Sequence, residues 1–199
     1  MKGRNLTGLV IGGLILILFF WGCNGYNGLV KQDETVKNSW ANVQSSYQRR
    51  ADLIPNLVAT VKGAADFEKE TYTQVALARA GQLTEALKIS ADSLNPQRMQ
   101  QIQQASKEAL DAARMAINIA VERYPDLKAT GNFTDLQRQL EGTENRINTA
   151  RNDFNASVNT FNTKVRSFPV NIFAGMMGFK PKDAFAAEAG AEKAPEVKF

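Results

Sequence analysis

Residues 36–63, VKNSWANVQSSYQRRADLIPNLVATVKG, decide the fold predicted for this chain. Mostly apolar residues recur here at alternating steps of four and three: Val36, Trp40, Val43, Tyr47, Arg50, Ile54, Leu57 and Val61. These steps place all eight side chains on one face of a helix, in a seven-residue register suited to lengthwise packing. Arg50 puts a charge in this seam, and Pro55 lies where proline usually kinks a helix. Because such local violations gather at functional sites, the middle of this helix is a candidate site.

Good helix formers dominate the interior of the chain, and no Asn-Gly hairpin lies between alternating apolar runs. A glycine-bearing joint, NGYNG, is expected at 24–28, and a helix break at Gly81. Asn95 followed by Pro96 is a typical helix start. The expected helices are about 29–65, 66–80 with a short piece at 84–90, 96–123 and 132–168.

The last of these helices has the longest seam. Its positions are Phe133, Leu136, Leu140, Thr143, Ile147, Ala150, Phe154, Val158, Phe161, Val165 and Phe168. Their mean spacing of about 3.5 residues predicts lengthwise packing, and a helix of this length is roughly 55 Å long. The predicted fold is therefore all-α, an elongated antiparallel bundle of about four helices.

Composition excludes several classes of function. The 199 residues include no histidine, which is the commonest general base and metal ligand, and one cysteine, Cys23. A disulfide within the chain, a cysteine-cluster zinc site and a conventional catalytic triad are therefore excluded. The formal net charge is +4, and Lys2 and Arg4 account for two of those charges. The remaining charges are mixed along the chain, which argues against nucleic-acid binding. We predict no catalytic residues, no metal and no cofactor.

Residues 6–22, LTGLVIGGLILILFFWG, carry no charge and would span about 26 Å as a helix, close to the hydrocarbon thickness of a bilayer. Lys2 and Arg4 precede them, and the next basic residue is Lys31, so we expect a cytoplasmic N-terminus and an external bulk domain. A lipoprotein anchor on Cys23 is the alternative, since Gly22 precedes it, although Phe20 and Trp21 fit that signal poorly. Bulky residues at 19–21 also argue against a cleaved secretory signal.

The chain accordingly divides into three predicted parts. Residues 1–25 form a transmembrane anchor, residues 26–182 a helical bundle, and residues 183–199 a disordered tail rich in Ala, Glu, Lys and Pro.

Arg50 needs a partner inside the bundle, because an unpaired buried charge is costly. Glu141 and Glu144 flank an interruption in the seam of the last long helix. We predict an ion pair between Arg50 or Arg49 and one of these glutamates, with Glu144 the first choice. The pair would set the register of the helices or, alternatively, bind a partner or ligand.

An apolar segment follows Pro169 and holds Ile172, Phe173, Met176, Met177 and Phe179. One interpretation is that it folds back and closes one end of the bundle. The other is that it is exposed and contacts the membrane or a partner.

Five blocks of this sequence resemble the LemA family in order and spacing: YNGLVKQDETVKNSWANV, YQRRADLIPNLVATVKG, RYPDLKATGNF, LEGTENRINTARNDFN and FNTKVRSFPVNIFAGMMGFKP. The resemblance covers about residues 26–185. It implies a bacterial, membrane-anchored, elongated helical protein, and it implies no particular activity. Phe154 and Phe161 stand where tyrosine is frequent in the family.

The function expected from these observations is that of a non-enzymatic scaffold or adaptor in the bacterial cell envelope. Its partners would be the membrane, other envelope proteins and, through its seams, further copies of itself. The alternative is a sensor that binds a small ligand near Arg49, Arg50 and the Pro55 kink.

Overall fold

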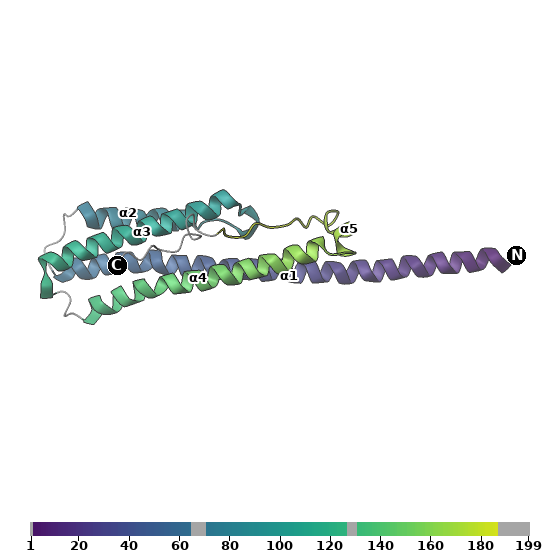
Figure 1. The fold of residues 1–199 in the computed structure, drawn as a ribbon, viewed down its shortest axis with the longest axis horizontal. Coiled ribbons are helices and arrows are strands. Elements are labelled where there is room, and N and C mark those ends of the chain that lie inside the picture. The colour runs from purple at the N-terminus through teal and green to yellow at the C-terminus, as the bar shows by residue number, and fades with distance from the viewer. Residues whose placement is uncertain (1, 65–70, 127–130, 187–199) are drawn as a thin grey trace, which may run out of the picture.

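The computed structural model describes residues 2–64, 71–126 and 131–186, apart from the side chains of residues 2–11, 14–21, 23 and 62–64. Every regular element in these ranges is helical: α1 (Lys2–Ala64), α2 (Thr71–Ala86), the 3-10 turn η1 (Ala91–Ser93), α3 (Pro96–Arg123), α4 (Gly131–Arg166) and α5 (Val170–Ala174). Consecutive long helices alternate in direction, and α4 runs antiparallel along α1 while α2 and α3 pair beside them (Figure 1). The predicted elongated, all-helical antiparallel bundle is therefore confirmed.

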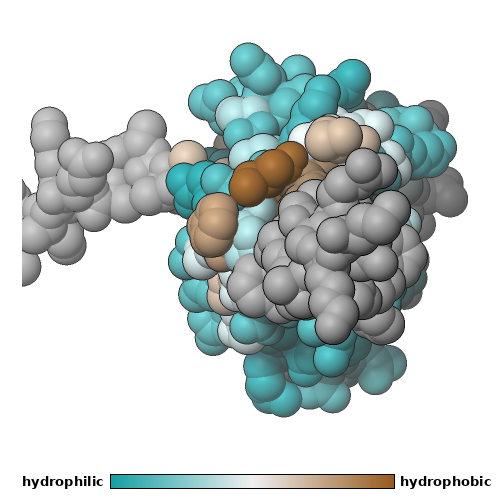
Figure 2. Space-filling model, turned by 90° about the vertical axis from the view of Figure 1, so that its right-hand side faces the viewer, coloured by the Kyte–Doolittle hydropathy of each residue, from teal (hydrophilic) through white to brown (hydrophobic). Residues whose placement is uncertain are grey.

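The core forms along the predicted seams. All eight seam positions of α1 are buried, Arg50 included, and on α4 the predicted positions are buried except Leu136, which is half-buried, and Phe168. Hydrophilic residues cover most of the coloured surface in the end view of Figure 2. The seven-residue register therefore marks the contact lines between the helices.

α1 is longer than predicted, because the expected joint at residues 24–28 is helical. Because Gly25 and Gly28 have no side chain, Val170 and Lys164 can pack close to the backbone of α1. A Cβ atom on Gly28 would clash with Lys164 Nζ, and one on Gly25 would lie 3.4 Å from Val170 Cγ2. α1 also continues without interruption through Pro55, which lies on the exposed face of the helix.

Gly81 does not end the second helix, in contrast to the prediction. α2 continues to Ala86, and Gly81 is exposed within it, with open space around its Cα. One glycine costs a helix only about 1 kcal/mol relative to alanine. Burial of Ala76, Ala80 and Leu83 on the same helix outweighs that cost.

The helix boundaries on either side of the α3–α4 hairpin have simple causes. Asn95 caps α3 as predicted, because its side-chain oxygen accepts a hydrogen bond of 2.9 Å from the backbone N–H of Arg98. α4 ends at Arg166, two residues before the predicted end, and the side chain of Phe168 is 78% exposed. Pro169 disfavours helical geometry for the residue before it, so Phe168 leaves the seam.

The folded region extends beyond the predicted boundary at residue 182. Residues 175–186, here called the strap, return over the bundle from α5 towards η1 (Figure 1). Phe185 is buried between Trp40 and Phe154, with ring centroids 6.3 and 5.6 Å away. Residues 187–199, most of the predicted tail, lie outside the described residues.

Within the described residues, no helix has enough length and hydrophobicity to cross a bilayer. Most of the predicted anchor at residues 6–22, together with Cys23, lies outside the residues whose side chains are described.

Candidate functional site

Arg50 is buried at the centre of the bundle and its guanidinium joins three helices. Its Nε donates to Thr143 Oγ1 at 2.9 Å, and one terminal nitrogen donates to Ser106 Oγ at 2.7 Å. The other terminal nitrogen pairs with Glu144 Oε2 at 2.6 Å. α1 supplies the arginine, α3 the serine, and α4 both the threonine and the glutamate. The pairing of Arg50 with Glu144, first choice from the sequence, is thus present in the structure.

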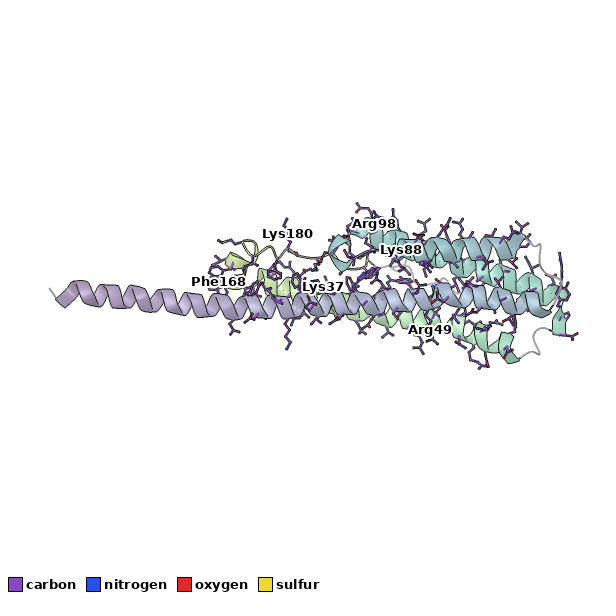
Figure 3. All side chains as sticks on the ribbon, turned by 180° about the vertical axis from the view of Figure 1, so that it is seen from behind. Lys37, Arg49, Lys88, Arg98, Phe168 and Lys180 are labelled. Atoms are coloured by element: carbon purple, nitrogen blue, oxygen red, sulfur yellow. The ribbon has the colours of Figure 1, made fainter. Side chains whose placement is uncertain are left out.

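The other two predicted members lie apart from this cluster. Arg49 is exposed and projects from the surface of α1 (Figure 3). Glu141 is also exposed and accepts a hydrogen bond of 3.3 Å from Gln137 on its own helix. The sequence placed Thr143 in the seam of the last long helix but did not indicate that Thr143 or Ser106 would accept a hydrogen bond from Arg50.

A cleft of about 190 Å³ opens beside the Arg50–Glu144 pair. Lys107, Asp111 and Arg114 of α3 line it, together with Gln103. The Nε2 atom of Gln103 is buried and has no hydrogen-bond partner among the described atoms. A buried amide donor without an acceptor is costly, so a small acceptor group bound in this cleft would find a donor in Gln103.

A second charged cluster fastens the strap, and the sequence did not predict it. The Nζ atom of Lys182 lies 2.9 Å from both Asp33 Oδ1 and Asp92 Oδ1, and Lys37 lies 2.9 Å from the other oxygen of Asp33. Burial alone would raise the pKa of Asp33, but the hydrogen bonds from Lys37 and Lys182 hold it below the usual value. Burial alone would lower the pKa of Lys182, but the hydrogen bonds with Asp33 and Asp92 raise it above the usual value.

Two asparagines on α4 hold the backbone of the strap. The side-chain oxygen of Asn162 accepts from Lys182 N at 2.8 Å, and its amide donates to Lys182 O at 2.7 Å. Asn155 makes the same paired contacts with Phe185, at 2.8 and 3.1 Å. The seven-residue spacing of the two asparagines on one helix face was the available signal, but asparagine on a helix surface is usually only solvated.

The apolar segment after Pro169 satisfies both interpretations in part. Phe173 and Phe179 are half-buried, and Phe179 packs on Tyr26 of α1 with ring centroids 5.9 Å apart. Ile172, Met176 and Met177 are 55%, 86% and 37% exposed. The segment therefore closes the bundle end with one side and leaves the other side open.

No group of three or more acidic, cysteine or histidine residues capable of holding a metal occurs within the described ranges. The buried polar atoms of the Arg50 cluster are occupied by one another, so this cluster fits a structural role.

Comparison with known proteins gives one family. The family model described as the LemA family matches residues 39–199. The Protein LemA of Metamycoplasma hominis is 24% identical over 131 residues, which is 66% of this chain and 55% of that relative. This chain therefore spans about half the length of the curated relative it matches.

Proposed function

The chain belongs to the LemA family, and from that premise we propose that it is a membrane-tethered helical rod that serves as a non-enzymatic scaffold or adaptor in the bacterial cell envelope. The observation that carries the proposal is the continuity of α1. One helix of 63 residues begins with the apolar stretch and ends as a member of the bundle, so the anchor and the rod would move as one body.

The proposed tether is the uncharged stretch at residues 6–22. Its length matches the hydrocarbon core of a bilayer, and Lys2 and Arg4 on one side favour a cytoplasmic N-terminus with the bundle outside. Lipidation of Cys23 is the alternative anchor, and it would place the bundle beside the same membrane.

Long exposed helical faces support a binding role. The polar surface of a slender rod offers extended area to envelope partners or to further copies of the chain, whereas the absence of histidine from the sequence removes the usual catalytic base. This role requires attachment to the membrane and contact with other envelope proteins.

Attachment is tested by fractionating cells that express the full chain or a variant lacking residues 1–25. We expect the full chain in the membrane fraction, resistant to alkaline carbonate, and the truncated chain in the soluble fraction. Equal distribution of the two forms would overturn the tether. Mass analysis of the N-terminus distinguishes the intact helix from lipidated Cys23. Crosslinking in intact cells, followed by purification, should then capture discrete envelope proteins, and capture of none would overturn the adaptor role.

A second function is favoured by the unpaired amide of Gln103. We propose, as the alternative, that the cleft beside Arg50 binds a small carboxylate, with Lys107 and Arg114 supplying positive charge. Titration with acetate or a short peptide, followed by thermal unfolding, tests this proposal. A rise in melting temperature that Gln103→Leu abolishes would support a ligand site, and no rise at any concentration would exclude it.

A further inference from the structure

Exposed apolar side chains are concentrated at the end of the bundle formed by α5. We define the α5 tip as Phe168, Ile172, Met176 and Met177, which are 78%, 55%, 86% and 37% exposed. Apolar residues exposed singly are normal, but a cluster of four within ten residues indicates a binding surface. Figure 2, which views this end, shows the brown apolar surface gathered in one region of an otherwise hydrophilic exterior.

The α5 tip sits directly after the apolar stretch of α1. Val170 packs against Gly25, and an apolar crevice between the two helices is lined by Gly22, Tyr26 and Phe173 among others. Figure 3 shows Phe168 at the end of the bundle from which the N-terminal part of α1 projects. The tip therefore lies beside α1 within about one helical turn of residue 22.

This position gives the tip a definite depth if residues 6–22 cross a bilayer. At 1.5 Å per residue, Tyr26 lies about 6 Å beyond Gly22 along α1. The polar headgroup layer on each side of the hydrocarbon core is about 5–8 Å thick. The level of Tyr26 and the α5 tip is thus the headgroup layer, where exposed tyrosine and other amphipathic groups are stable.

Basic residues lie close to the tip: Arg166 and Lys180 are within three residues of it along the chain, and Lys164 lies beside Gly28 of α1. Lys31, Lys164, Arg166 and Lys180 have no carboxylate partner among the described residues. The nearby Asp33 and Glu34, by contrast, are already paired with lysines. Unpaired cations within a Debye length of a surface attract anionic lipid headgroups.

We propose that the α5 tip is a membrane-interface contact that inserts into the headgroup layer of a bilayer containing anionic phospholipid. Ile172, Met176 and Phe168 enter the layer, and the four basic residues attract its phosphates from the outer edge of the layer. The inference rests on the proposed tether, and it adds a second contact that fixes the angle between the rod and the membrane. A single helix would leave that angle free.

The test uses the full chain with Cys23→Ser and one new cysteine carrying an environment-sensitive fluorophore. The four positions are Ile172 and Met176 in the tip, Met115 on α3 as the exposed apolar control, and Leu16 in the apolar stretch. Each protein is reconstituted in phosphatidylcholine vesicles with or without phosphatidylglycerol, and nitroxide lipids labelled at the headgroup or in the acyl chain serve as quenchers.

We expect the labels at Ile172 and Met176 to be blue-shifted and quenched by headgroup nitroxides, more strongly when phosphatidylglycerol is present. The label at Met115, which is 54% exposed in the native chain, should show neither change. Replacing Lys31, Lys164, Arg166 and Lys180 with glutamine should remove the lipid dependence. Ile172, Met176 and Met115 are exposed, so labels at these three positions preserve the fold.

The outcomes separate the two proposals. If the label at Leu16 is quenched by acyl-chain nitroxides but the labels at Ile172 and Met176 are not quenched, the interface contact is overturned and the tether stands. The tip would then be expected to bind a protein partner. Absence of quenching at Leu16 overturns the tether itself. Equal quenching at Met115 and at the tip means non-specific adsorption of the rod and also overturns the inference.

Discussion

Replacing Glu144 with alanine should destabilise the bundle through the charge that it leaves behind on Arg50. The arginine side chain is only 3% exposed, so its guanidinium depends on fixed partners. Two of those partners, the hydroxyls of Ser106 and Thr143, carry no charge. Without Glu144, the bundle core would hold a cation with no ionic partner, which is a recognised source of large mutational effects.

The magnitude follows from the burial of the two partners. Breaking a fully buried ion pair costs about 3–5 kcal/mol, but the side chain of Glu144 is 46% exposed and solvent screens the interaction. We therefore expect Glu144→Ala to lower the free energy of unfolding by about 1–3 kcal/mol. In the Arg50→Met background the same change should cost less than about 0.5 kcal/mol, because no buried cation remains.

The assay is urea denaturation of the full chain in mild detergent, followed by far-ultraviolet circular dichroism. Comparing the two single variants with the double variant isolates the coupling between the residues. Glu141→Ala is the matched control, since Glu141 lies on the same helix, is exposed, and accepts a hydrogen bond from Gln137 instead of Arg50.

Two results would refute this reasoning. One is an equal cost for Glu144→Ala with and without Arg50. The other is a cost for Glu144→Ala no larger than that for Glu141→Ala, which would mean that the buried guanidinium is satisfied by the two hydroxyls and water.

Three further predictions concern the strap, its charges and a helix cap. Phe185→Ala should lower the free energy of unfolding by about 2–4 kcal/mol, because it removes a buried ring. Phe168→Ala removes an exposed ring and should change that free energy by less than about 0.5 kcal/mol. Urea titrations measure the free energy of unfolding of both variants. The pKa of Asp33 is lower in the folded state than in the unfolded chain. Its contribution is therefore complete above roughly pH 5 and is lost as pH falls below roughly 4. Denaturation across this range should show that the free energy of unfolding of wild type exceeds that of Asp33→Asn by less as the pH falls. A difference that does not change with pH would contradict the pairing with Lys182. Asn95→Ala should cost about 0.5–2 kcal/mol by removing the cap of α3, and unchanged thermal unfolding would show that the cap contributes nothing.

Helix boundaries were predictable where a local chemical reason sets them. Asn95 starts α3 because its side chain caps the backbone N–H of Arg98, and that signal lies within four residues. The glycines at 25, 28 and 81 misled the prediction for the opposite reason. Whether a helix continues through a glycine depends on how the rest of that helix packs, and the burial of neighbours such as Leu29, Ala80 and Leu83 outweighs the modest local cost of glycine.

The candidate site likewise contains one ion pair that the sequence could predict and one charged cluster that it could not. A charge in an apolar seam must find a partner, so the pairing of Arg50 with a glutamate of α4 could be predicted. The strap cluster could not, because Lys182 joins Asp33 and Asp92 across about 90 residues or more of sequence, and nothing in the local pattern of these residues distinguishes them from solvated surface charges.

The sequence alone determined the helical class, the contact lines of the long helices and the need for a counter-charge to Arg50. These properties follow from a side-chain repeat of about 3.5 residues and from the cost of burying a charge, and both are independent of topology. Only the tertiary structure decided that residues 24–28 remain helical, that Phe185 closes the core, and which apolar side chains after Pro169 face outwards. Those outcomes depend on contacts between segments far apart in the chain, whose free energies no local pattern records.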